Sequence, residues 1–332
     1  MGTSRSSADC LTRRQFLRRA ARAGVGLGAA ALLPGRVLAG GATSRPALAT
    51  VVRVRSRRVT DGRVIRVDIL QQMIEQGLMR LTGRGRVADA WRAVVGDAEK
   101  LLLKFRADAA DVLQTSPEMA SALAASLTGS GFAAESLIAC ELEASVAERL
   151  SLGAAPHGHR TALCDYGSGK DHLNRFLFAA DAIVNVPFLT DDRICGLACA
   201  IKNVAYSAVR HPSRMHASRC DPQLADIYAL PEVGGKVGLH VCNAVRAICA
   251  GGPGGGAEWL YRGLFLATDP VALDVVALEA LELERRRRTV SASSPAEAMA
   301  SVRPRAGYLE TAARKGVGVG SLDHINVVDV TL

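Results

Sequence analysis

The stretch "DAIVNVPFL", residues 181–189, is apolar over almost its whole length and rich in β-branched side chains. A strand with one solvated face alternates apolar and polar residues, whereas a strand buried on both faces reads as a continuous apolar run. Comparable strand-like runs are "TVVRVRS" (50–56), "KLLLKF" (100–105), "SLIACE" (136–141) and "GKVGLHVC" (235–242). Helix-like segments separate them. The pattern predicts an α/β fold with a mainly parallel β-sheet flanked by helices on both faces.

The order of the elements also indicates where a ligand would bind. The longer predicted helices cover residues 67–81, 117–131, 192–210 and 271–287. In open parallel sheets, ligands bind beyond the carboxyl ends of the strands. Candidate site residues are therefore sought directly after each predicted strand.

Composition excludes one class of partner. With 49% hydrophobic residues, a chain of 332 residues can bury a substantial core. The formal net charge is +9, but the N-terminal segment 1–39 is rich in arginine and carries most of it. The small remaining charge is too weak to argue for nucleic acid as a partner.

The segment "LTRRQFLRRAARAGVGLGAAALLPGRVLA", residues 11–39, has the three parts of a secretory signal. A basic stretch precedes the apolar run 23–33, and the segment ends in small and apolar residues at Ala39. Its head, "TRRQFLR", resembles the twin-arginine export motif. The alternative is a basic amphipathic N-terminal helix.

This reading divides the chain into a signal peptide (1–39), a small-residue linker (40–50) and an α/β domain (51–332). It predicts a periplasmic or extracytoplasmic location. The apolar run of the signal is too short to span a bilayer comfortably, and no transmembrane span is expected in the mature chain.

Two cysteines form a candidate metal site. Cys195 and Cys199 are four residues apart, so a helix would place both on one face, where His216 or Cys220 could complete the ligand set. The alternative is apolar packing of buried thiols. No tight Cys-x-x-Cys-x-x-Cys run is present, so the chain has no cluster-binding motif, and the cofactor is left undefined.

Six fragments occur in an order that resembles the domain of unknown function 362 family, over roughly residues 50–330: "KLLLKF", "VNVPFLTDD", "GLACAIKN", "CDPQLADI", "GGP" and "TDPVALD". That family has no assigned activity. Some members are fused to ferredoxin-like iron–sulfur modules, so the resemblance implies an iron–sulfur association and a redox partner.

The resemblance also implies a set of site residues around one cleft. The candidates are the catalytic residues Lys104, Lys202, Asp226 and Asp274 and the ligand-binding residues Asn185, Asn203 and Asp269. Lysine and aspartate would stabilise charge and transfer protons. Composition alone explains some of them differently, since Lys and Asn are common at helix C-termini and Asp before Pro caps a helix.

The chain departs from the family pattern at Arg106, Thr190 and Asn243. Two hypotheses follow. The first is an exported enzyme or binding protein of redox or anionic-metabolite chemistry, with a small anionic ligand in the cleft. The second is a non-catalytic accessory protein, exported folded with a partner, and these departures favour it.

Overall fold

The computed structural model describes residues 48–291 and 299–332. Most neighbouring strands in its large sheet are parallel, while β14 runs antiparallel to both β1 and β12. The strand order is β15 (Ile325–Thr331), β1 (Ala49–Arg55), β14 (Gly263–Ala267), β12 (Val237–Ala250), β9 (Ala182–Asn185), β4 (Leu101–Lys104), β5 (Leu137–Cys140) and β6 (Gly153–Ala154). Strands β10 (Phe188–Asp192) and β13 (Ala257–Trp259) also pair with β12, and β11 (Gly196–Ala198) pairs with β10. The predicted α/β fold with a mainly parallel sheet is confirmed.

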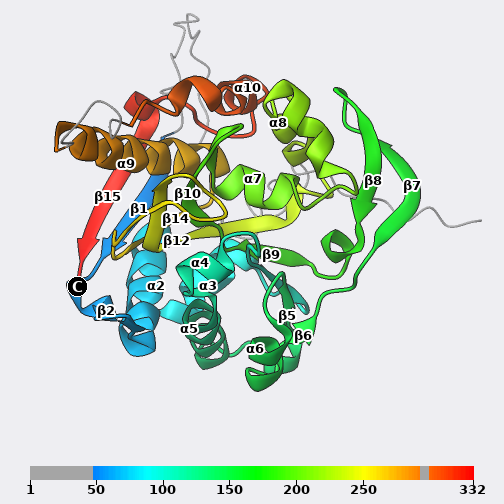
Figure 1. Ribbon diagram of the computed structural model, residues 1–332. Helices are drawn as coiled ribbons and strands as arrows, with labels where there is room; N and C mark the ends of the chain where they lie inside the picture. The colour runs from blue at the N-terminus through cyan, green and yellow to red at the C-terminus, as the bar shows by residue number, and fades with distance from the viewer. Residues whose placement is uncertain (1–47, 292–298) are drawn as a thin grey trace, which may run out of the picture. The chain divides into compact units, whose positions relative to one another are not determined.

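Helices cover both faces of this sheet (Figure 1). Below it in the figure are α2 (Val67–Thr82), α3 (Val87–Val95), α5 (Ser116–Gly129) and α6 (Ala144–Arg149). Above it are α7 (Ala200–Ala205), α8 (Gln223–Tyr228), α9 (Pro270–Val290) and α10 (Tyr308–Arg314). Three of the four longer predicted helices correspond to α2, α5 and α9.

Alternate side chains of the central strands enter two separate cores. In β4, Leu102 packs into the core that contains α9, while Leu101 and Leu103 pack into the core that contains α2. In β9, Ile183 and Val184 divide in the same way. Because neither face meets water, both positions of the alternation are apolar, and the strand reads as a continuous run.

The opening stretch is interrupted in the structure. It forms β9 and the start of β10, with a break at Val186 and Pro187. Proline has no N–H for the ladder, but the carbonyl of Pro187 accepts a hydrogen bond from Asn243 N at 2.8 Å. The long strand β12 therefore pairs first with β9 and then with β10.

The prediction of one helix over residues 192–210 is wrong. Strand β10 continues to Asp192, β11 pairs back against it, and the helix α7 covers only Ala200–Ala205. The Asp192 carboxylate closes the turn by accepting from Cys195 N at 2.9 Å. Gly196 then takes a left-handed φ of 78°, which glycine adopts without steric cost.

The remaining elements lie outside the central layers. The hairpin of β7 (His159–Asp165) and β8 (Lys170–Asn174) forms its own sheet, as do β2 (Thr60–Asp61) and β3 (Val64–Ile65). Short helices follow β1 (η1, Arg57–Val59) and β4 (α4, Ala110–Leu113).

The first strand of the sheet begins near the predicted start of the α/β domain. Strand β1 begins at Ala49, within the predicted linker, because Ala49 pairs with Ile325 of β15. The predicted signal peptide (1–39) lies outside the described residues, as does most of the linker. In the part of the chain that the structure describes, no helix combines the length and apolar character needed to cross a membrane.

Candidate functional site

The carboxyl ends of β4 and β9 lie side by side at one edge of the sheet. The strands are parallel, and Lys104 is the register partner of Asn185. From β4 the chain continues to β5 on one side and later returns to β9 on the other side. Such a reversal of strand order leaves a crevice beyond the strand ends, where open α/β sheets bind ligands.

Lys104 is fully buried and its ammonium group has three partners. It donates to the Phe105 carbonyl at 2.7 Å and to Asn203 Oδ1 at 3.5 Å, and it lies 3.0 Å from Glu141 Oε1. The Asn203 amide, from α7, donates to the Lys104 carbonyl at 3.3 Å and to Asn185 Oδ1 at 2.7 Å. Three predicted site residues therefore form one connected group.

The hydrogen bonds continue from Asn185 into the core. Asn185 Nδ2 donates to the Ala200 carbonyl and to His240 Nδ1, both at 2.9 Å. Burial lowers the pKa of His240 to about 3, so the ring is neutral. Because Nδ1 accepts, the ring proton is on Nε2 and points to the Tyr228 hydroxyl, 3.1 Å away. We call Lys104, Asn203, Asn185, His240 and Tyr228 the polar chain.

Lys202 forms a buried ion pair with Asp192. The two side chains contact each other directly and are only 9% and 6% exposed. Burial alone would raise the pKa of Asp192, but the charge and hydrogen bond of Lys202, together with hydrogen bonds from Cys195 N and Ile194 N, outweigh it and lower that pKa to about 2. Burial alone would lower the pKa of Lys202, but Cys195 and Asp192 outweigh it and raise that pKa. The pair is fixed in its charged form.

Arg106 extends the site beyond β4. Its Nη1 donates to Thr190 Oγ1 at 2.7 Å and to the Ala198 carbonyl at 2.9 Å, which holds the guanidinium in place. Its Nε and Nη2 both donate to the Asp108 carboxylate, Nη2 at 3.0 Å. The Arg106 side chain is 5% exposed, whereas that of Asp108 is 51% exposed.

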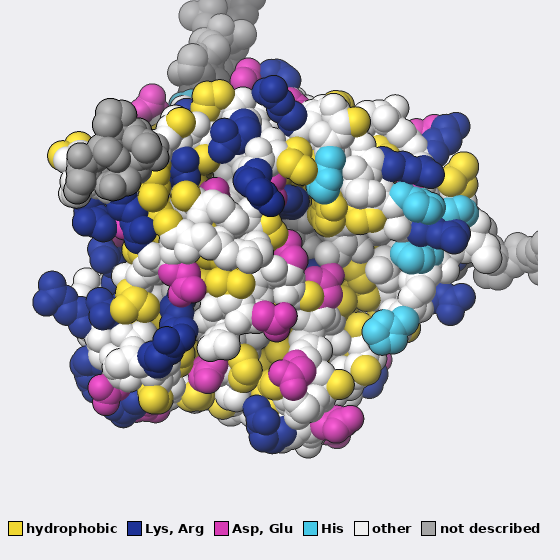
Figure 2. Space-filling view, viewed as in Figure 1, with side chains coloured by type: hydrophobic (Ala, Val, Ile, Leu, Met, Phe, Trp, Pro, Cys, Tyr) yellow, Lys and Arg dark blue, Asp and Glu magenta, His cyan; other side chains and the backbone are white. Residues whose placement is uncertain are grey.

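These groups border a cleft of about 340 Å³. Figure 2 shows side chains of both charge signs around a hollow near the middle of this face. The cleft wall includes Arg106, Asp108, Glu141, Lys202, Asn203 and Arg210. Lys104 lies behind this wall, covered by Glu141 and Asn203.

Two predicted catalytic residues lie outside the cleft wall. Asp226, on α8, pairs with Lys315, whose Nζ is 2.5 Å from Oδ1. Asp274, on α9, accepts hydrogen bonds from the backbone N–H groups of Ala200 at 2.6 Å and Ile201 at 3.0 Å. Asp274 therefore anchors the start of α7, the helix that carries Lys202.

Asp269 also lies away from the cleft wall, at the start of α9. Its side chain accepts from Ala272 N and from Val319 N, each at 2.9 Å. The first bond is the N-cap that the Asp-Pro pair indicated. The second ties the segment after α10 to the same carboxylate.

Cys195 and Cys199 do not share a helix face, because the predicted helix over 192–210 is absent. Cys195 lies in the turn between β10 and β11, and its Sγ contacts the Leu197 carbonyl at 3.5 Å. Cys199 precedes α7, with its Sγ 3.5 Å from Cys242 Sγ. Among the described residues, no group of three or more His, Cys, Asp or Glu side chains is arranged to hold a metal ion.

Several members of the site are not indicated by the sequence. The family pattern marks Arg106 only as a departure. No motif marks Glu141, although it directly follows a strand, the position that parallel sheets use for ligands. Its φ of 57° is left-handed, an uncommon backbone conformation for a residue with a side chain.

The fold and the site together define an α/β protein with a charged cleft at the carboxyl ends of parallel strands. Residues 163–279 match the model of a family described as "Domain of unknown function (DUF362)". That range contains Asn185, Lys202 and Asn203, while Lys104 and Arg106 precede it. The match supports the family resemblance for that part of the chain. No curated protein matches the chain.

Proposed function

We propose that this protein is exported and binds a small anionic metabolite, a carboxylate or phosphate, in the cleft. One observation carries the proposal: Arg106 and Lys104 are buried cations whose partner carboxylates, on Asp108 and Glu141, are exposed to solvent at the cleft. The signal peptide predicted over residues 1–39 supports export. Mass spectrometry of the exported protein tests that part, with Gly40 as the expected first residue.

The exposed partners are replaceable. A buried cation needs a counter-charge, because an uncompensated buried charge costs several kcal/mol. Asp108 and Glu141 supply it from the solvent side, with side chains 51% and 30% exposed. An incoming anion can take the place of either carboxylate while the cation stays compensated. Asp192 differs, since it is 6% exposed and is also held by two backbone N–H groups.

Arg106 is the primary anchor in this proposal. Its Nη1 is held by Thr190 and Ala198, so the guanidinium is fixed before a ligand arrives. The edge formed by Nε and Nη2 matches the two oxygens of a carboxylate or phosphate. Asp108 already occupies this edge in the way a ligand would.

Lys104 and Glu141 supply the chemistry if the bound molecule reacts. A lysine ammonium next to the cleft stabilises negative charge that develops on a substrate. Glu141, in the cleft wall, is placed to accept a proton from it. These roles replace those assigned to Asp226 and Asp274 in the sequence analysis.

Isothermal titration at fixed ionic strength tests the binding proposal with inorganic phosphate, acetate and succinate as probes. Arg106→Gln is expected to weaken binding of the best probe by about tenfold or more, because a charge-assisted pair is lost. Asp108→Asn is expected to strengthen it, because the internal competitor is removed.

The matched control is Arg66→Gln. Arg66 pairs with Asp68 at the same sequence spacing as Arg106 with Asp108, but on the exposed surface. It should leave affinity unchanged. If all three probes fail to bind, or if Asp108→Asn weakens binding, an anion does not take the place of the Asp108 carboxylate on Arg106.

The accessory function is the second candidate. It is favoured by the fact that Lys104, Arg106 and Lys202 each already have a carboxylate partner, as in a purely structural network. A redox partner protein would then supply the iron–sulfur chemistry that the family resemblance implies. Under this alternative, none of the three probes binds to the wild type or to Asp108→Asn.

A further inference from the structure

A second pocket, separate from the cleft, lies where β1 and β15 end. It has a volume of about 560 Å³, and we call it the arginine pocket. Arg55, Arg57 and Arg262 line it together with Tyr261 and Thr331, and none of the lining residues in the described part of the chain has a carboxylate side chain. It shares no lining residue with the cleft.

The register of β1 and β15 shows that one arginine of β1 has no acid opposite it. Arg53 is paired in register with Asp329, and their side chains form an ion pair at 2.6 Å. Two residues further along, on the same face of both strands, Arg55 is paired in register with Thr331. The position that holds an acid for Arg53 therefore holds a neutral hydroxyl for Arg55.

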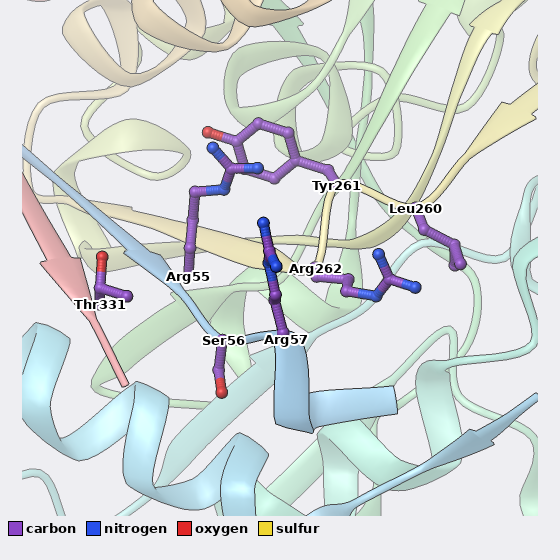
Figure 3. Close-up of a pocket in the computed structure, with 7 residues that line it drawn as sticks. All are labelled: Arg55, Ser56, Arg57, Leu260, Tyr261, Arg262 and Thr331. Atoms are coloured by element: carbon purple, nitrogen blue, oxygen red, sulfur yellow. The ribbon is translucent and has the colours of Figure 1, made fainter. Parts of the chain in front are cut away.

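Arg57 adds a second charge on the same side. Figure 3 shows the side chains of Arg55 and Arg57 extending in the same direction, toward the Tyr261 ring, while Arg262 extends to the other side. Arg262 Nε donates to Thr60 Oγ1 at 2.9 Å. Within the described ranges, none of these three arginines has a salt bridge.

The floor of the pocket is rigid. The Tyr261 ring lies over Gly263, where a Cβ would be only 2.7 Å from a ring carbon, and it stacks on Phe265 with ring centroids 5.1 Å apart. The Arg55 guanidinium lies 4.9 Å from the Tyr261 ring centroid. Burial raises the pKa of Tyr261 to about 12, so the phenol adds no negative charge.

We propose that the arginine pocket binds a phosphate-type oxoanion between Arg55 and Arg57. Two guanidinium groups that point the same way, with no acid between them, repel each other unless an anion intervenes. Guanidinium groups match the oxygens of a phosphate in pairs. The Thr331 hydroxyl, where an acid would block the site, can donate a further hydrogen bond.

Inorganic pyrophosphate is the probe, titrated into the full mature protein by calorimetry at fixed ionic strength. Thr331→Asp places an acid beside Arg55, as Asp329 is beside Arg53, and is expected to lower affinity about tenfold or more. Arg57→Gln, an exposed substitution that leaves the strands intact, is expected to lower it by about tenfold.

Two controls separate this site from general charge effects and from the cleft. Arg58→Gln removes the neighbouring charge outside the pocket, and Arg106→Gln removes the anchor of the cleft. Both should leave pyrophosphate affinity unchanged. The proposal is overturned if the wild type does not bind, if Thr331→Asp and Arg57→Gln bind as tightly as the wild type, or if Arg58→Gln weakens binding as much as Arg57→Gln.

The phosphate can belong to a soluble molecule or to a lipid headgroup. Sedimentation with phosphatidylglycerol vesicles, compared with phosphatidylcholine vesicles, distinguishes the two. Cosedimentation that is lost in Thr331→Asp assigns the pocket to a headgroup. Pyrophosphate binding without cosedimentation assigns it to a soluble ligand.

Discussion

The cleft and the arginine pocket both gather cations at strand ends of one sheet, but they compensate the charge in opposite ways. In the cleft, Lys104 and Arg106 are buried and each has a carboxylate partner. In the arginine pocket, Arg55 and Arg57 are exposed, and the described residues offer them no such partner. A buried cation must be paired, whereas an exposed one is compensated by water and salt. An anion that binds in the cleft must therefore displace a carboxylate, whereas the described residues that line the arginine pocket include no carboxylate to displace.

Breaking the most buried pair of the cleft should have the largest effect. Asp192→Asn leaves the Lys202 ammonium buried without a counter-charge. We expect the free energy of unfolding to fall by about 3–5 kcal/mol, the usual result of removing one partner of a buried pair. Urea denaturation followed by circular dichroism measures it.

The control for that variant is Asp68→Asn, which breaks the exposed pair with Arg66. Its expected cost is much smaller, because solvent screens exposed pairs. Equal costs for Asp192→Asn and Asp68→Asn would show that burial does not distinguish the two kinds of pair.

The contribution of Asp274 to stability should depend on pH. This carboxyl group anchors the start of α7, and the size of its effect on the free energy of unfolding should be intermediate. Burial raises the pKa of Asp274 to about 7, despite hydrogen bonds from Ile201 N and Ala200 N. An unfolded aspartate has a pKa of about 3.9. Between these values only the folded state binds the proton, so this residue's contribution to stability is present at pH 4 and is lost as the pH rises to 7.

Urea denaturation of the wild type and of Asp274→Asn at pH 4 and pH 7 tests this. The variant lacks the titrating group, so the stability advantage of the wild type should shrink from pH 4 to pH 7. A difference that is constant, or that grows over this range, contradicts a raised pKa at Asp274.

The smallest effect is expected in the arginine pocket. Arg57→Gln removes an exposed, unpaired charge, so the free energy of unfolding should change by less than about 0.5 kcal/mol. Any change should be toward greater stability and should shrink in high salt, because repulsion from Arg55 is relieved. A loss of more than 1 kcal/mol in urea denaturation would mean that Arg57 has a structural role, and the contrast with the cleft would fail.

The sequence predicts the layers of the fold well, because β4 and β9 are buried on both faces and their apolar runs are continuous. It fails over residues 192–210, where a buried hairpin and a short helix are as apolar as a long helix. The turn there depends on the Asp192 carboxylate bonding to backbone N–H groups, which composition does not reveal.

The site is predicted only in part. Lys104 and Asn185 converge because the parallel strands β4 and β9 end at one edge of the sheet, a position that the strand pattern predicts, and Asn203 joins them from α7. Asp274 lies one turn into its own helix, beyond the cap position, and it accepts hydrogen bonds from the first residues of α7, many residues away in the chain. Such a long-range partner leaves no local pattern.

The polar chain has a direction. Lys104 donates to Asn203, which donates to Asn185, and Asn185 donates to His240, which donates to Tyr228. An ammonium group has no lone pair to accept a hydrogen bond, so Lys104 must be the donor in the first bond. Each following side chain then accepts from the one before it and donates to the next. Reversing a single amide would set donor against donor on one side and acceptor against acceptor on the other. The five side chains therefore share one donor-to-acceptor sense, and the carbonyls of Lys104 and Ala200, which accept from Asn203 and Asn185, hold both amides in that orientation.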